Sequence, residues 1–78
     1  MKINFSLHSA ISDCTAAINL DKLYTKAYLR RATARIELRY FEDAKKDIEM
    51  ILKLDPTDKE AKKMKIMVEN RIRKESQV

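Results

Sequence analysis

The stretch TKAYLRRATARIELRYFEDAKKDIEMILKLDPTD, residues 25–58, decides the fold class of this chain. It contains no Gly and only one Pro, so one uninterrupted helix fits on each side of a short link at residues 39–40. Apolar side chains recur at helical spacing on both sides of that link. They are Ala27, Tyr28, Ala32, Ala34 and Leu38 before it, and Phe41, Ala44, Ile48, Ile51 and Leu52 after it. So short a link predicts antiparallel helices over 24–38 and 41–54.

The flanking sequence predicts two more helices. Pro56 ends the helix over 41–54, because it has no amide proton to donate and disfavours helical geometry at Asp55. Thr57 and Glu60 have the spacing of a capping box, which predicts the start of a helix over 58–74. An amphipathic stripe upstream predicts another helix over 7–20. The chain is therefore expected to be all-α, with about four helices packed as antiparallel hairpins.

An internal repeat relates two of these helices. The segment HSAISDCTAAINLD (8–21) aligns with EDAKKDIEMILKLD (42–55) at a constant offset of 34 residues. The matched pairs are Ala10 with Ala44, Asp13 with Asp47, Ile18 with Leu52, Leu20 with Leu54, and Asp21 with Asp55. A constant offset of this length is typical of stacked helical repeats.

With this period, the chain resembles the tetratricopeptide repeat (TPR) family, whose repeat has 34 residues. Tyr28, Ala32, Phe41, Ala44 and Pro56 match the family pattern, whereas Arg31 and Arg35 replace its usual Leu and Tyr. The resemblance implies right-handed superhelical stacking. It also implies five segments: an N-terminal lead (1–7), the second helix of an incomplete repeat (8–21), a complete repeat (25–58), a basic capping helix (59–74) and a tail (75–78).

The segment KAYLRRA, residues 26–32, resembles the last-repeat signature of chaperone-adaptor TPR domains. Those domains bind C-terminal tails that end in Glu-Glu-Val-Asp, on heat-shock proteins of the seventy and ninety classes. The resemblance implies that Lys26 and Arg30 are two members of a dicarboxylate clamp. Residues four apart share a helix face, and a guanidinium group can hold a carboxylate in two places. Thr33 and Glu37 continue this face and are expected to extend the peptide-binding groove.

The N-terminus departs from that branch of the family, in which further clamp donors come from two preceding repeats. Here MKINFSLH leads directly into a second-type helix, and only Lys2 and Asn4 are available to imitate those donors. We therefore expect a fragment, a truncated form or a diverged short version of a larger domain. Because about three repeats are normally needed to bury their apolar faces, we expect marginal stability or homo-oligomerisation through helix 8–21. The side chains expected to be only partly covered are Ile11, Cys14 and Ile18.

The charge of the chain lies mainly at its C-terminal end. Lys and Arg number 17 against 12 Asp and Glu, a net charge of +5, and residues 59–78 alone hold seven basic and three acidic residues. A basic helix is usually a solvated face, but it also attracts acidic proteins, nucleic acid or anionic membranes. Since no aromatic residues interleave with these lysines, the signal for nucleic acid is weak.

Catalytic and metal-binding patterns are missing from the sequence. One His and one Cys are too few for a zinc site or a nucleophilic pair, and a chain without Gly has no Gly-rich phosphate loop. We expect no enzymatic activity, no cofactor, no metal and no small-molecule substrate, and Cys14 is expected to be a core residue. The lone Cys and the lack of a secretory signal or long apolar run predict a cytoplasmic protein.

Three functions follow from these observations. The leading hypothesis is an interaction module, a co-chaperone TPR fragment that binds acidic C-terminal peptides of heat-shock chaperones through a partial clamp at Lys26 and Arg30. The first alternative is a structural or self-associating TPR module without carboxylate binding. The second is a basic helix over 59–74 that binds nucleic acid or an anionic membrane, which the composition favours least.

Overall fold

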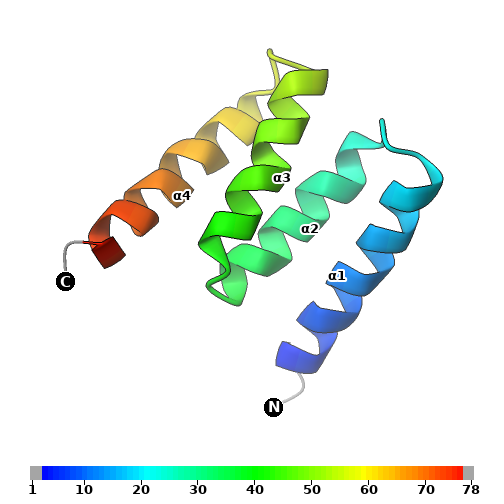
Figure 1. The fold of residues 1–78 in the computed structure, drawn as a ribbon, viewed down its shortest axis with the longest axis horizontal. Coiled ribbons are helices and arrows are strands. Elements are labelled where there is room, and N and C mark those ends of the chain that lie inside the picture. Colours follow the sequence, from blue (N-terminus) through cyan, green and yellow to red (C-terminus); the bar gives the residue numbers. More distant parts are fainter. Residues whose placement is uncertain (1–2, 77–78) are drawn as a thin grey trace.

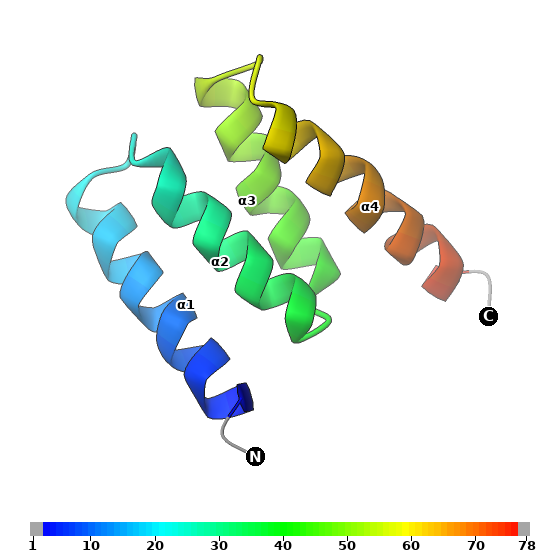
Figure 2. The ribbon, with the colours of Figure 1, turned by 180° about the vertical axis from the view of Figure 1, so that it is seen from behind.

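A computed structural model describes the backbone of residues 3–76 and the side chains of residues 7–75. Its four helices are α1 (Ile3–Leu20), α2 (Thr25–Glu37), α3 (Phe41–Leu54) and α4 (Lys59–Ser76), and no strand occurs in residues 3–76. Each helix packs against the next in the chain, and successive helices run in opposite directions (Figures 1 and 2). The array measures 39 × 36 × 16 Å, so it is a single layer of helices. This confirms the prediction of an all-α chain of antiparallel hairpins.

Helices α2, α3 and α4 share one apolar core. Ala32, Ala44, Ile48 and Val68 are fully buried, and α3 lies between α2 and α4 in both views (Figures 1 and 2). Alanines at the contacts let the helix axes approach closely, while the branched side chains fill the space between them. The apolar stripes predicted from the sequence are therefore the buried faces of these helices.

Helix α1 is better covered than its sequence predicts. Cys14 and Ile18 are only 8% and 7% exposed, and only Ile11 is half-buried as expected. The expectation of partial cover was wrong for the first two, because α2 packs along α1 and places Ala27 and Tyr28 in the same core cluster as Ile18. One neighbouring helix is thus enough to bury the inner face of α1.

The outer two helices are longer than predicted. Helix α1 begins at Ile3, within the range assigned to the lead (1–7), and α4 extends to Ser76, within the range assigned to the tail (75–78). No Pro or Gly interrupts either extension, so nothing in the local sequence stops the helix. Lys2 lies outside the described residues, as does the side chain of Asn4.

The two turns that flank α3 form without glycine, the first through the backbone of Arg39 and the second through side-chain hydrogen bonds. Arg39 adopts φ 67°, a left-handed conformation that Gly usually supplies, and its amide donates to the Ile36 carbonyl at 3.0 Å. After α3, the Asp58 carboxylate accepts from the Ala61 amide at 2.9 Å and caps α4. The capping box predicted from Thr57 was therefore wrong by one residue. Thr57 instead donates its hydroxyl to the Asp55 carboxylate at 2.7 Å, because the turn after Pro56 folds it back.

Candidate functional site

Helix α2 carries four cationic side chains that divide between two faces. Neighbouring residues on a helix are rotated by about 100°, so Arg30 and Arg31 point in different directions although they are adjacent in sequence. Arg31 and Arg35 are half-buried, whereas Lys26 and Arg30 are exposed. These two pairs therefore have different structural roles.

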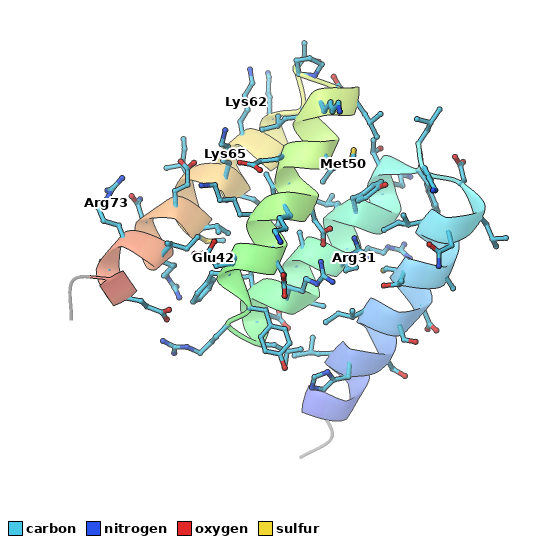
Figure 3. All side chains as sticks on the ribbon, in the orientation of Figure 1. Arg31, Glu42, Met50, Lys62, Lys65 and Arg73 are labelled. Carbon is cyan, nitrogen blue, oxygen red and sulfur yellow. The ribbon has the colours of Figure 1, made fainter. Side chains whose placement is uncertain are left out.

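The inward pair holds a buried acid. Asp47 on α3 is 3% exposed, and its carboxylate accepts two hydrogen bonds from Arg31, at 3.0 Å from Nε and 2.7 Å from Nη2. Arg35 donates a third from Nη1 at 2.9 Å. Arg31 also donates from Nη1 to the Thr15 hydroxyl of α1 at 3.0 Å. Figure 3 shows Arg31 among the side chains between α1, α2 and α3, so this network ties three helices together.

The chemistry of the network identifies its arginines as structural. The hydrogen bond to Asp47 raises the pKa of Arg31, so its charge is fixed at all accessible pH values. Sequence reasoning recorded Arg31 and Arg35 only as departures from the family pattern and missed their partner. The available signal was Asp47, a carboxylate that lies within the buried stripe of α3. A buried carboxylate requires a cation, and α2 supplies two.

The outward stripe contains all four residues that the sequence singled out for binding. Lys26, Arg30, Thr33 and Glu37 are exposed and spaced four, three and four residues apart, so they lie along one line of α2. Among the described residues, no hydrogen bond or ion pair reaches the side chains of Lys26, Arg30 or Glu37. Thr33 donates its hydroxyl to the Leu29 carbonyl within its own helix at 2.9 Å. The charged heads of this stripe are therefore available to an outside partner.

This stripe borders two hollows in the seam between α1 and α2, which together we call the α1–α2 groove. The larger has a volume of about 330 Å³ and is lined by Leu7, Ala10, Leu29, Arg30, Thr33, Ala34 and Glu37. The smaller, about 220 Å³, is lined by Asp13, Cys14, Ala17, Tyr24, Ala27 and Arg30. Arg30 belongs to both hollows and so stands in the middle of the groove. Lys26 lies one helical turn from Arg30 and is not among the lining residues.

The groove floor has no reactive group of its own. Cys14 is buried there, and desolvation raises the pKa of its thiol, which disfavours the reactive thiolate. This agrees with the predicted core role of Cys14. The groove therefore combines apolar walls with charges at its rim, a composition suited to binding a peptide.

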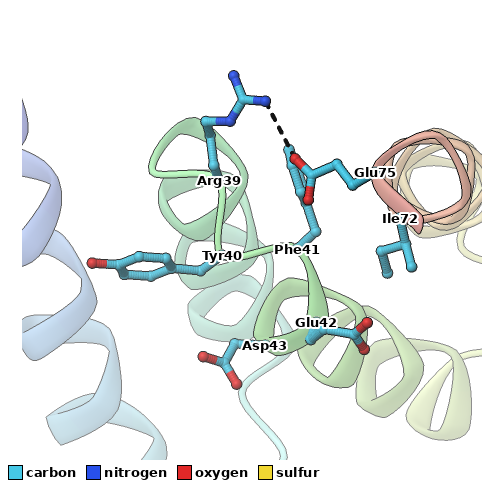
Figure 4. Close-up of a pocket in the computed structure, with 7 residues that line it drawn as sticks. All are labelled: Arg39, Tyr40, Phe41, Glu42, Asp43, Ile72 and Glu75. Atoms are coloured by element: carbon cyan, nitrogen blue, oxygen red, sulfur yellow. Dashed lines mark hydrogen bonds and ion pairs between the residues drawn. The ribbon is translucent and has the colours of Figure 1, made fainter. Parts of the chain in front are cut away.

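A third hollow of about 320 Å³ lies between the α2–α3 turn with the start of α3 and the C-terminal end of α4, and it contains none of the predicted residues. It is lined by Arg39, Tyr40, Phe41, Glu42, Asp43, Ile72 and Glu75 (Figure 4). The Arg39 guanidinium pairs with Glu75 at 3.2 Å across it. Tyr40 points towards α1, where its ring centroid lies 6.2 Å from that of His8. These contacts join the α2–α3 turn to its neighbours.

The basic charge predicted for the last helix lies on the surface of α4. Lys62 and Lys63 are exposed, and Figure 3 shows Lys62, Lys65 and Arg73 on this helix. Within residues 3–76 no helix is long and apolar enough to cross a membrane. The same part of the chain contains no group of three or more His, Cys, Asp or Glu side chains placed to hold a metal ion.

Comparison with known proteins places this geometry among helical-repeat domains. No protein-family model matches the chain. RNA polymerase II-associated protein 3 of Mus musculus is 54% identical over 52 residues, which cover 67% of this chain and 8% of that protein. Serine/threonine-protein phosphatase 5 of Homo sapiens is 46% identical over 66 residues, which cover 85% of this chain and 13% of that protein. The chain thus spans only a small part of these relatives.

Two solved structures also match the chain. The first TPR domain of human RPAP3, solved by NMR, superimposes with a TM-score of 0.86 at 38% identity, covering 91% of this chain and 56% of that one. The first TPR of Spaghetti (RPAP3), bound to the HSP90 peptide SRMEEVD, superimposes with a TM-score of 0.78 at 42% identity. The match covers 80% of this chain and 49% of that one. Repeat period, helix stacking and these similarities agree, and the chain belongs to the tetratricopeptide-repeat family.

Proposed function

We propose that this chain is a non-catalytic interaction module that captures the C-terminal carboxylate of an acidic peptide with Lys26 and Arg30. One observation carries the proposal. Arg30 lines the α1–α2 groove, Lys26 is exposed one helical turn away, and neither side chain has a hydrogen bond or ion pair among the described residues, while the neighbouring Arg31 and Arg35 are paired with Asp47. Of the two cationic pairs on α2, only the outward one therefore has charge available for a ligand.

The electrostatics of this pair favour an anionic ligand. Like charges four residues apart on a helix repel each other by about 0.2–0.5 kcal/mol. A carboxylate between them removes this repulsion and accepts charge-assisted hydrogen bonds from both head groups. Since Arg30 borders both hollows, a peptide held there extends along the groove and contacts apolar walls such as Leu7 and Leu29.

The similarity to RPAP3 supports an acidic chaperone tail as the partner. The first TPR of Spaghetti (RPAP3) is bound to the HSP90 peptide SRMEEVD, and this chain is 42% identical to it. The chain covers 49% of that structure, so it supplies about half of the comparable domain. Because binding energy is concentrated in a few central contacts, we expect Lys26 and Arg30 alone to bind such a tail weakly.

A peptide titration tests this function. SRMEEVD should bind the chain, and its C-terminally amidated form should bind less tightly. Arg30→Ala and Lys26→Ala should each raise Kd about tenfold, the expected effect of losing one charge-assisted contact. Lys46→Ala, which removes an exposed cation from α3, should leave Kd unchanged.

The same titration separates the alternatives. Equal binding of the free and amidated peptides would exclude carboxylate capture. A requirement for Lys62 and Lys63, together with steep salt dependence and indifference to Arg30, would instead favour the basic face of α4. Concentration-dependent mass without any peptide binding would favour the self-associating module.

A further inference from the structure

We propose that Glu37 selects peptides that carry a cationic residue five positions before their C-terminal residue. The inference rests on the proposed function and concerns the far end of the same groove. Glu37 lines the larger hollow together with Arg30, is exposed, and has no ion pair or hydrogen bond to a side chain within residues 7–75. It gives an otherwise cationic stripe an anionic end.

The spacing along α2 sets the position that Glu37 meets. Eleven residues separate Lys26 from Glu37, a rise of about 16.5 Å at about 1.5 Å per residue. An extended peptide covers the same distance in about five residues. The groove follows the α1–α2 seam, so a peptide lying in it runs alongside α2. With its terminal carboxylate placed at Lys26, the member of the pair farther from Glu37, the fifth residue before the end lies beside Glu37.

The chemistry between the two ends completes the match. Leu7, Ala10, Leu29 and Ala34 separate Arg30 from Glu37 along the larger hollow and give it apolar walls. The groove therefore presents cations, then an apolar stretch, then a carboxylate. The ends of the peptide SRMEEVD match the ends of this stripe, since Arg stands five positions before the terminal Asp, with Met, Glu, Glu and Val between them. A tail with an acidic residue at that position would be repelled by Glu37.

Three peptides and three variants of the full 78-residue chain test this selection. Wild type should bind SRMEEVD more tightly than SQMEEVD, and SQMEEVD more tightly than SEMEEVD, with steps of about two- to fivefold in Kd, as expected for an exposed ion pair. Glu37→Gln should make the three affinities nearly equal, and Glu37→Lys should reverse their order. Glu49→Gln, which removes an exposed carboxylate from α3, should preserve the wild-type order.

The outcomes distinguish this inference from the function on which it rests. Binding that requires Arg30 but is indifferent to the residue five before the end would overturn the role of Glu37 and leave carboxylate capture intact. If the Glu37→Gln variant still prefers the peptide with Arg, another residue of the chain causes the preference, and the inference is likewise overturned. If none of the three peptides binds, both proposals fail. Because Glu37 is exposed, circular dichroism should show the same helix content in all variants.

Discussion

The two faces of α2 use the same kind of side chain for opposite purposes. On the inner face, Arg31 and Arg35 surround Asp47, which is 3% exposed, and join α1, α2 and α3. On the outer face, Lys26 and Arg30 extend into solvent beside the α1–α2 groove. The difference arises from the position of the acid, since only the inner face meets a buried carboxylate. A cationic segment such as LRRATAR (29–35) therefore contains both structural arginines and a binding arginine. They lie on different faces because successive residues of a helix are about 100° apart.

The largest expected effect comes from removing the acid that defines the inner face. Asp47→Ala leaves two partly buried arginines without a counter-charge, and we expect a loss of about 3 kcal/mol in the free energy of unfolding. Urea denaturation followed by circular dichroism measures this loss. Glu49→Ala, an exposed acid on the same helix, should change stability by less than about 0.5 kcal/mol. Equal midpoints for the two variants would show that the buried network does not stabilise the chain.

The next effect contrasts the adjacent arginines directly. Arg31→Ala removes three hydrogen bonds and should cost about 2 kcal/mol of stability. Arg30→Ala should leave stability within about 0.5 kcal/mol of wild type, or raise it slightly, because it relieves repulsion from Lys26. Peptide affinity should respond in the reverse manner, with Arg30→Ala the more damaging. Similar stability losses in the two variants would mean that the faces are not distinct.

A smaller effect concerns the link from the network to α1. Thr15→Val keeps the shape of the side chain but removes the acceptor for Arg31 Nη1, at a cost of about 1 kcal/mol. Since Cys14 is buried and burial raises its pKa, its alkylation should be slow in the folded wild type and faster when α1 opens. We therefore expect Thr15→Val to speed alkylation. An unchanged rate would show that α1 docks independently of Arg31.

The smallest effect concerns an exposed carboxylate outside both faces. Hydrogen bonds from the Thr57 hydroxyl and amide lower the pKa of Asp55 below its ordinary value of 3.8. The ionised form of Asp55 is thus favoured in the folded state. Its contribution to the free energy of unfolding is present above the ordinary pKa and is lost as the pH falls through the lowered pKa. Thr57→Ala should reduce the loss of stability that occurs as the pH falls below the ordinary value of 3.8. Urea denaturation at a series of pH values measures this difference. Identical dependence of the free energy of unfolding on pH in wild type and Thr57→Ala would show that the Thr57–Asp55 hydrogen bond does not contribute to stability.

The sequence predicted the helices and the outward stripe because both depend on local spacing. Residues four apart must share a helix face, so Lys26 and Arg30 were placed together without knowledge of the fold. The inward network depends on how α2 and α3 rotate against each other, and Arg31 lies 16 residues from Asp47. Periodicity within one helix does not fix that rotation. The cap at Asp58 was missed for a related reason, because the turn geometry after Pro56 decides which neighbouring side chain reaches the free amide.

Arginine side-chain NMR of the 78-residue chain tests the division of α2 most directly. The Nε–Hε resonances of Arg30 and Arg31, assigned by mutation, are followed while SRMEEVD or its amidated form is added. We predict that the free peptide shifts the Arg30 resonance strongly, that the amidated form shifts it less, and that Arg31 stays fixed on Asp47 throughout. An unmoved Arg30 resonance at saturating peptide, or a shift confined to Arg31, would contradict the account.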